Sequence, residues 1–258
     1  MTCWFDGPLA AFAAETTGPD AERDRITAAA LAVQRLPGTR PEVVHWLVDP
    51  GVPVPPGDRP RGHGRWPAPV MEEIARALVR QCAAARPLVV MNAPFGLTLL
   101  DRELRRHRAS SLPRALETVP LCVLDPLVLD RHLDRYRKGG RALGDLCEQY
   151  GVEPDGTPGA AAAAMAALEL TRAVGRRFAA RLERLSAAEL HTLQAVWHAA
   201  GARGPQTWFA RAGTEQAVDP AWPLRSELPA RACAEPDGAT GPPDPAERRA
   251  ANEKTGPS

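Results

Sequence analysis

The chain has 258 residues, of which 44% are apolar, and a formal net charge of +1. This length is enough for one α/β domain of ordinary size with extensions, and the apolar content supports a sizeable hydrophobic core. The near-zero net charge excludes a global electrostatic attraction to nucleic acid, so any such binding needs a local basic patch.

The five cysteines lie at positions 3, 82, 122, 147 and 233 and form no Cys-x-x-Cys pair. An odd count without such pairs argues against disulfides and against a structural zinc site. The N-terminus lacks a charged-then-apolar signal pattern, and no apolar run approaches the roughly 20 residues that a membrane-spanning helix needs. We therefore expect a cytoplasmic protein with no membrane association.

The first 49 residues predict three strands, because apolar runs alternate there with short polar turns. The strands are expected at Leu9–Ala14, Ile26–Val33 and Val43–Val48. Such short turns favour an antiparallel meander. Residues 50–69 are rich in proline, glycine and arginine and predict a surface loop, to which we assign His63 rather than giving it a role as ligand or base.

Helices and strands alternate over the next part of the chain. Apolar residues at i, i+3 and i+4 predict an amphipathic helix first, and the last helix begins with the capping-box pair Ser186 and Glu189. The expected elements are helix Met71–Ala85, strand Leu88–Met91, turn Asn92–Phe95, helix Leu97–His107, strand Leu121–Leu124 and helices Val128–Tyr136, Ala142–Tyr150, Gly159–Leu182 and Ser186–Ala200, with Gln206–Arg211 a candidate for a further turn. This order fits a mixed sheet with helices on its faces.

Three parts of the chain are expected. Residues 1–182 form the α/β domain, residues 183–225 a helical extension, and residues 226–258 a disordered tail in which proline, glycine, alanine and charge dominate.

Two stretches are locally basic. The arginines at 102, 105, 106 and 108 are most simply the solvated face of a helix, with phosphate contact as the alternative. The stretch Arg135–Arg141 combines Arg137 and Lys138 with Tyr136 and two glycines. It could be a solvated loop, but this composition also suits contact with the backbone of a single strand.

One carboxylate, Glu15, ends the first predicted strand, beside Thr16, Thr17 and Gly18. On local residues alone, a solvated side chain is its simplest interpretation. The segment Phe12-Ala13-Ala14-Glu15-Thr16-Thr17-Gly18, however, resembles the first motif of the DnaQ-like (DEDDh) 3′–5′ exonucleases, which reads Phe-Asp-x-Glu-Thr-Thr-Gly.

Two further segments extend the resemblance. Asn92-Ala93-Pro94-Phe95-Gly96-Leu97-Thr98-Leu99-Leu100 is similar to the second family motif, Asn-Ala-x-Phe-Asp-x-x-x-Leu. The third, His-x-Ala-x-x-Asp, is placed at Pro158–Ala163 by its spacing from Cys147–Val152. The resemblance covers roughly residues 5–225, extends to actinobacterial members, and implies a ribonuclease H-like fold: a mixed five-stranded sheet with helices on both faces, plus a helical C-terminal extension.

The resemblance implies two Mg²⁺ or Mn²⁺ ions held by four carboxylates, with a histidine as general base. Here Ala13, Gly96 and Ala163 stand at three of the acid positions and Pro158 at the histidine position, so Glu15 is the one retained acid. None of the four replacements can ligate a metal through its side chain. We therefore expect no metal cofactor, with Mg²⁺ or Mn²⁺ at Glu15 only if activity survives.

Three other acids, Asp101, Asp125 and Asp155, are candidates for a substitute metal site. The simpler expectation is that Asp101 caps or decorates its helix and that Asp125 ties down a turn.

The leading hypothesis is a pseudo-exonuclease that binds single-stranded DNA or another nucleic-acid 3′ end without cleaving it. The resemblance places Thr16, Thr17, Asn92 and Phe95 beside the bound strand, and the basic stretch adds Arg137 and Lys138. One alternative is a residual metal-dependent 3′–5′ DNA exonuclease resembling the epsilon subunit of DNA polymerase III. Another is a protein-interaction module that uses Trp197, Trp208 and Trp222 to bind a protein partner, although we expect at least one of these in the core.

Overall fold

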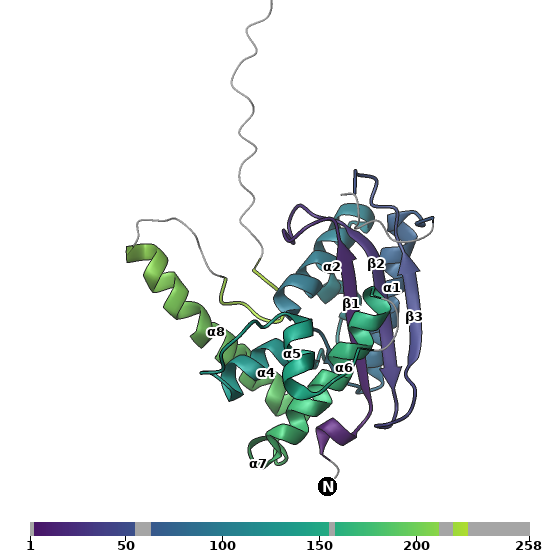
Figure 1. The fold of residues 1–258 in the computed structure, drawn as a ribbon. Helices are drawn as coiled ribbons and strands as arrows, with labels where there is room; N and C mark the ends of the chain where they lie inside the picture. The colour runs from purple at the N-terminus through teal and green to yellow at the C-terminus, as the bar shows by residue number, and fades with distance from the viewer. Residues whose placement is uncertain (1–2, 55–62, 155–157, 212–218, 227–258) are drawn as a thin grey trace, which may run out of the picture. The chain divides into compact units, whose positions relative to one another are not determined.

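The fold is built around a five-stranded mixed sheet (Figure 1). The structure is a computed structural model that describes residues 3–54, 63–154, 158–211 and 219–226. The side chains of residues 204–211 are not described. The strands are β1 (Leu9–Thr16), β2 (Ile26–Gln34), β3 (Glu42–Leu47), β4 (Leu88–Val89) and β5 (Val123–Leu124). Their order is β3-β2-β1-β4-β5. The first three strands pair antiparallel, and β4 and β5 run parallel to β1. The predicted mixed sheet and its antiparallel meander are confirmed.

Helices cover both faces of the sheet. One core cluster contains residues of α1 (Pro67–Ala83), α2 (Ala93–Arg108) and α3 (Leu112–Leu116). The other contains residues of α4 (Pro126–Leu133), α5 (Leu143–Tyr150), α6 (Ala160–Arg177) and α7 (Ala179–Leu182). A short 3-10 helix, η1 (Trp4–Asp6), precedes β1, and α8 (Ala187–Arg211) follows α7.

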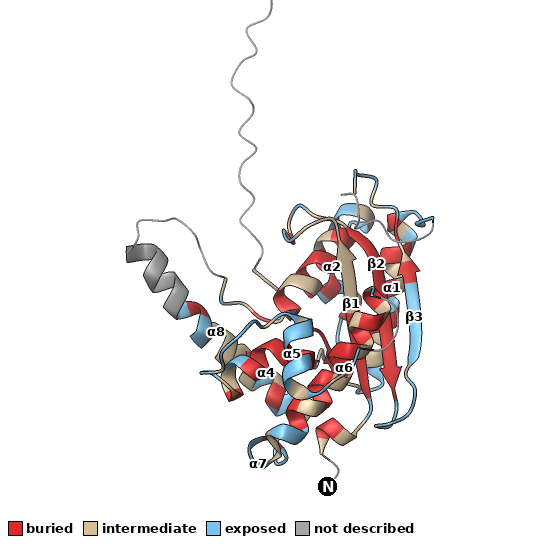
Figure 2. Cartoon of the chain, in the orientation of Figure 1, coloured by how far each residue is buried: buried red, intermediate tan, exposed pale blue. Residues whose placement is uncertain are grey.

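The two faces of β2 explain how closely the helices approach. All nine residues of β2 are buried, as expected for a strand that is covered on both sides. Ala28, Ala30 and Ala32 lie in the same cluster as the alanine-rich helix α6, which contacts β1 and β2. Small side chains on both partners let helix and sheet pack at short range. Figure 2 shows β2 in red and α6 in red and tan, whereas β3 is largely exposed over Glu42–His45.

Several predicted boundaries differ from the structure. α1 begins at Pro67, four residues before its predicted start, because proline is tolerated in the first turn of a helix. α2 begins at Ala93, within the predicted turn Asn92–Phe95. The predicted helix Gly159–Leu182 is two helices that meet at Phe178, whose φ of −113° departs from helical geometry. The sequence patterns missed the short elements η1 and α3.

The C-terminal part of the described chain packs onto the core. Trp222 is 9% exposed and belongs to the same cluster as α1 and α2, and the backbone N–H of Arg225 donates to Thr98 Oγ1 at 2.9 Å. Trp197 is half-buried against both clusters. The expectation that at least one of the three tryptophans lies in the core is confirmed, whereas the Trp208 side chain falls outside the described residues.

The chain divides into two units, Met1–Arg225 and Ser226–Ser258. The predicted tail, 226–258, lies outside the described residues from position 227 onward. Within the residues described, no helix combines the length and the apolar character required to cross a membrane.

Candidate nucleic-acid interface

Glu15 and Ala13 share one face of β1, because alternate residues of a strand point the same way. Ala13 packs against the cluster that contains α6, so Glu15 also lies on the α6 side of the sheet. The register of β1 against β2 shifts between Glu15 and Thr16. Glu15 is half-buried, and its carboxylate makes no hydrogen bond or ion pair with any residue the structure describes.

The two threonines after Glu15 build the turn into β2. Thr16 Oγ1 donates to the carbonyl of Gly18 at 2.7 Å. Thr17 Oγ1 donates to Asp24 Oδ1 at 2.8 Å and accepts from the backbone N–H of Arg25 at 3.0 Å. Both hydroxyls, at positions where the resemblance implies strand contact, are therefore engaged in the turn itself.

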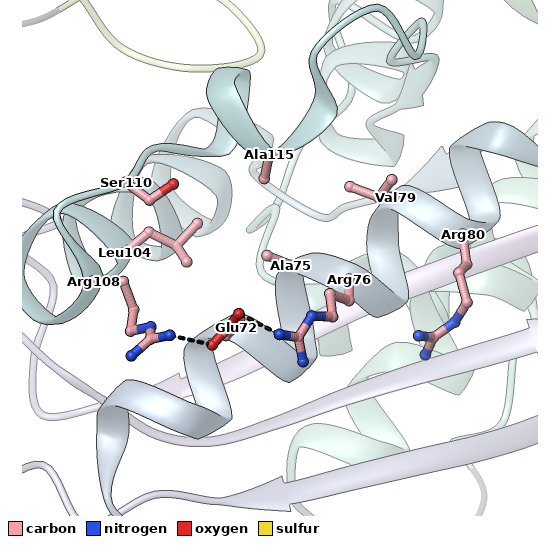
Figure 3. A pocket seen from close by; sticks show the side chains of 9 residues that line it. All are labelled: Glu72, Ala75, Arg76, Val79, Arg80, Leu104, Arg108, Ser110 and Ala115. Carbon is pink, nitrogen blue, oxygen red and sulfur yellow. Dashed lines mark hydrogen bonds and ion pairs between the residues drawn. The ribbon is translucent and has the colours of Figure 1, made fainter.

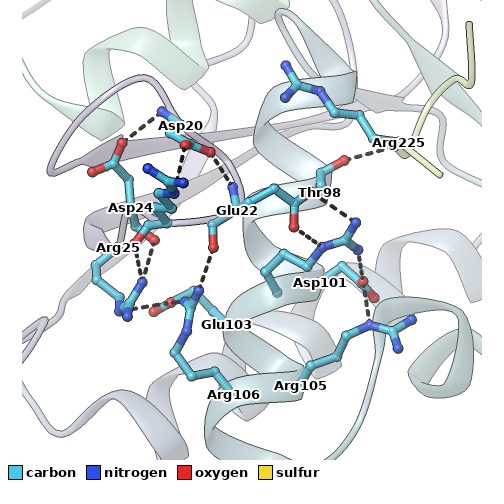
Figure 4. A network of polar contacts seen from close by, with 12 residues as sticks. Asp20, Glu22, Asp24, Arg25, Thr98, Asp101, Glu103, Arg105, Arg106 and Arg225 are labelled. Carbon is cyan, nitrogen blue, oxygen red and sulfur yellow. Dashed lines mark hydrogen bonds and ion pairs between the residues drawn. The ribbon is translucent and has the colours of Figure 1, made fainter. Parts of the chain in front are cut away.

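A network of charged side chains on α2 anchors this turn (Figure 4). Arg102 pairs with Glu22 through Nε at 2.7 Å and Nη2 at 3.1 Å, and Arg106 donates to the Glu22 carbonyl at 3.0 Å. The Nε atom of Arg25, the residue just before β2, lies 3.9 Å from Oε1 of the fully buried Glu103 of α2. The helix α2 and the turn between β1 and β2 are thus held together by ion pairs.

The expectation that the arginines of α2 form a solvated face is confirmed for Arg105 and Arg108, whose side chains are 40% and 43% exposed, and is wrong for Arg102, which this network draws inward. The Arg102 side chain is only 11% exposed, and Arg106 is 26% exposed and pairs with Glu103. Burial raises the pKa of Glu103, while Arg106 and Arg25 oppose that shift. Burial also lowers the pKa of His107, which lies 3.6 Å from Glu103.

Asp101 belongs to the same helix and is 1% exposed. Its carboxylate accepts from Arg102 Nη1 at 2.7 Å, Arg105 Nε at 2.8 Å and the backbone N–H of Leu112 at 2.8 Å. Contrary to the expectation from the sequence, Asp101 therefore neither caps α2 nor decorates its surface; it is buried within α2, and its carboxylate is engaged by two arginines of α2 and by the first N–H group of α3.

The second motif segment forms the start of α2. Asn92 adopts a left-handed conformation with φ of 56°, and its carbonyl accepts from the backbone N–H groups of Phe95 and Gly96. Asn92 is exposed, and Phe95 packs partly against the core. A Cβ at Gly96 would lie 3.4 Å from Val90 Cγ1, an ordinary contact, so neither backbone nor packing requires glycine there.

Asp125 fixes the backbone of that segment. Its carboxylate is fully buried and accepts from the backbone N–H groups of Asn92 at 3.1 Å, Ala93 at 2.8 Å and Leu127 at 3.0 Å. Burial raises the pKa of Asp125, and these hydrogen bonds oppose the rise. The expectation that Asp125 ties down a turn is confirmed. Asp155, the third candidate for a substitute ligand, lies outside the described residues.

The third motif segment leads into α6. Pro158 is exposed, and Ala163 is half-buried in the first turn, where its N–H donates to the Gly159 carbonyl at 2.9 Å. Because α6 packs on β1 and β2, this segment belongs to the helix that covers the face carrying Ala13 and Glu15. The exposed His63 lies in the loop before α1, as expected.

The basic stretch 135–141 is organised by one buried acid that the sequence patterns did not single out. Asp130 accepts from Arg137 Nε at 3.3 Å, Arg141 Nε at 2.6 Å and the Tyr150 hydroxyl at 2.9 Å. Burial, followed by the hydrogen bond to Asp130, raises the pKa of Tyr150. Asp130 lies in α4, Arg137 and Arg141 lie between α4 and α5, and Tyr150 ends α5, so no periodicity within one element could reveal this cluster.

The same cluster divides the basic side chains into two groups. Arg137 is 7% exposed and also donates to the Gly140 carbonyl at 2.7 Å, so its guanidinium shapes the loop. Lys138 is exposed, and Tyr136 is 88% exposed with Arg135 at 5.8 Å from its ring centroid. Among the described residues, no group of three or more histidine, cysteine or acidic side chains has the arrangement of a metal site.

Comparison with solved structures identifies the fold. An exonuclease I from Methylocaldum szegediense matches with a TM-score of 0.52 and 18% identity over 67% of this chain and 41% of that one. E. coli exonuclease I in complex with a dA16 oligonucleotide matches with a TM-score of 0.54 and 16% identity, over 67% of this chain and 42% of that one. An exonuclease I complex with SSB-Ct matches with a TM-score of 0.53 and 16% identity, over 68% of this chain and 42% of that one.

These structures share the ribonuclease H-like fold with this chain, which confirms the predicted fold class. The chain spans about two fifths of the length of each of them. Comparison with protein-family models and with curated proteins returns no match.

Proposed function

We propose that this chain is a pseudo-exonuclease, which binds single-stranded nucleic acid or a 3′ end without cleaving it. The observation that carries the proposal is the set of side chains on the motif segments. Glu15 is the one carboxylate among the motif positions, and Ala13, Gly96, Pro158 and Ala163 supply no side-chain oxygen or nitrogen. The chain thus has the exonuclease I fold and recognisable motif segments, but these segments lack three of the metal-binding acids and the histidine that the resemblance implies.

This donor set does not fit the two-metal site that the resemblance implies. Two divalent ions need several oxygen ligands, commonly carboxylates. Asp101 and Asp125, the described acids considered as substitutes, are buried and accept hydrogen bonds from backbone or arginine donors. We therefore derive no reaction step through a metal.

The loop 134–141 is the surface we assign to strand binding. An exposed aromatic ring offers a stacking platform for a base, and an exposed lysine offers charge for a phosphate. Tyr136 and Lys138 are exposed, while Arg137 and Arg141 hold the loop through Asp130. Support also comes from E. coli exonuclease I, whose matching structure holds a dA16 oligonucleotide.

Fluorescence anisotropy of a 5′-labelled single-stranded oligonucleotide tests this proposal. Base–aromatic stacking contributes about 1–3 kcal/mol per base, so Tyr136→Ala combined with Lys138→Ala should weaken binding by about tenfold or more. Affinity should also fall as salt rises. The matched control is Arg40→Ala, an exposed arginine in the β2–β3 loop, which should bind as the unchanged protein does. Binding that ignores both salt and the double substitution would refute the proposal.

A residual exonuclease is the second candidate, and one observation favours it. The Glu15 side chain has no partner among the described residues and stays available to an ion. Restoring the family side chains with Ala13→Asp, Gly96→Asp, Pro158→His and Ala163→Asp should create Mg²⁺-dependent cleavage if the three segments still converge. Cleavage of equal rate before and after restoration would favour the residual enzyme.

A further inference from the structure

A pocket of about 490 Å³ lies between α1, the end of α2 and α3 (Figure 3). Its apolar lining consists of Ala75 and Val79 from α1, Leu104 from α2 and Ala115 from α3. Pockets for small ligands typically have volumes of about 300–1,000 Å³ and combine an apolar lining with a few polar groups. The volume and the lining therefore suit a compact organic ligand.

Charged side chains surround this apolar surface. Arg76, Arg80 and Arg108 line the pocket together with Glu72. The Glu72 carboxylate accepts from Arg108 Nη2 at 2.6 Å and also pairs with Arg76. Figure 3 shows the Glu72 carboxylate held between these two guanidinium groups. The pocket lining thus carries a clear excess of positive charge.

Arg80 has no such partner. Its guanidinium makes no hydrogen bond or ion pair with any part of the chain that the structure describes, and Arg80 is exposed. A planar guanidinium binds a carboxylate through two parallel hydrogen bonds. The Glu72 carboxylate already shows that arginines of this pocket hold such a group.

We propose that this pocket binds a small organic carboxylate, with its charged group at the arginines and its apolar body against Val79, Leu104 and Ala115. This site goes beyond the proposed strand-binding surface, since it belongs to α1–α3 and not to the loop 134–141. None of the described residues that line it is aromatic, so a nucleic-acid base would find no stacking partner there. An aliphatic or phenyl body needs only apolar contact.

Amide chemical-shift mapping on the full chain tests the proposal with 4-phenylbutanoate as the probe. The acid should shift amides of residues 75–80, 104–110 and 115. The neutral 4-phenylbutanamide should bind at least about tenfold more weakly, because hydrogen bonds to a charged group are stronger than neutral ones. Equal titration curves for acid and amide, or shifts confined to other parts of the chain, would overturn the proposal.

Two variants locate the site. Arg80→Ala removes a side chain without a described partner, so it should weaken the acid about tenfold or more, down to the level of the amide, and leave the fold intact. Ala115→Trp should fill the pocket and abolish both titrations. Arg40→Ala, outside the pocket, is the control and should change neither. A single-stranded oligonucleotide that shifts the same amides at lower concentration than the acid would identify a phosphate site instead and also overturn the proposal.

Discussion

Single carboxylates in this fold have very different surroundings, and these decide what each can do. Asp125 and Asp101 are buried and surrounded by N–H donors, which fixes their lone pairs in structural hydrogen bonds. The Glu15 carboxylate lies at the end of β1 without a partner among the described residues. Only a carboxylate of the second kind is free to bind a cation.

Substituting two helical glycines, Gly96 of the second motif segment and Gly175 of α6, tests whether the fold requires glycine at position 96. Gly96 has space for a Cβ, whereas a Cβ at Gly175 of α6 would lie 2.6 Å from Phe5 Cβ. Gly96→Ala should stabilise the protein by about 0.5 kcal/mol, because glycine within a helix is less favourable than alanine. Gly175→Ala should destabilise it by about 1–3 kcal/mol through overpacking. Urea unfolding of both variants measures this, and an equal loss in both would contradict it.

At the residue scale, the sequence predicted contacts that are local and missed contacts that are distant. Asp125 ties a turn beside it, as its position after a strand suggested. Arg102 was assigned to a solvated face because its partner, Glu22, lies 80 positions away along the chain. No periodicity connects residues that only the folded chain brings together.

Among the elements, α8 covers the β5 edge of the sheet. His191 Nδ1 accepts from the backbone N–H of Val123 at 3.0 Å, and Gln194 accepts from the N–H of Asp125 at 2.7 Å while donating to the Val123 carbonyl at 3.1 Å. These bonds satisfy backbone groups at a sheet edge that would otherwise be open to pairing with another strand. The sequence predicted the helix but not its docking site.

The His191 contact makes this docking dependent on pH. Burial lowers the pKa of His191, so the unfolded chain, with a pKa of about 6.5, binds a proton more readily than the folded one. Stability should therefore be full above about pH 6.5 and fall as the pH drops toward 5. His191→Gln keeps an acceptor that does not titrate and should flatten this slope in urea unfolding. The other histidines with a lowered pKa leave a residual slope, and an unchanged slope in the variant would contradict the assignment.

The structure of the loop 134–141 depends on the buried ion pairs that Asp130 forms with two arginines of the loop. Breaking a buried ion pair costs about 3–5 kcal/mol, and Asp130 is fully buried with Arg137 and Arg141 as partners. Asp130→Asn should lower the unfolding free energy by about 3 kcal/mol and speed hydrogen exchange across the loop. Glu148→Gln, on the exposed side of α5, is the control and should change neither. Protection of the loop amides that survives Asp130→Asn would show that other contacts hold it.

For the whole molecule, the segment 219–225 completes a core begun some 200 residues earlier. Trp222 and the N–H of Arg225 contact the cluster around α2. A chain ending at 226 should unfold like the full chain, whereas one ending at 218 should lose about 3–5 kcal/mol, comparable with removing a buried tryptophan. Thermal and urea unfolding of both truncations measure this. Equal stability of the two would place Trp222 outside the cooperative core.

The antiparallel meander of β1 to β3 was predictable because three apolar runs with short turns leave few arrangements, whereas the places of β4 and β5 followed only from the resemblance of the motif segments. For the candidate nucleic-acid interface, the sequence indicated which positions belong to the motif segments but not which contacts their side chains make. The Asp130 cluster of that site, and the separate pocket between α1, α2 and α3, arise from contacts between different elements, which no local pattern predicts.

Degradation of a 5′-labelled single-stranded DNA, with Mg²⁺ and with Mn²⁺, beside a Glu15→Ala control, tests the central claim most directly. We expect a strand of unchanged length in every lane, with the labelled strand bound by the unchanged protein in a parallel binding assay. Shortening from the 3′ end that disappears in the Glu15→Ala control would contradict it and make the chain a working exonuclease.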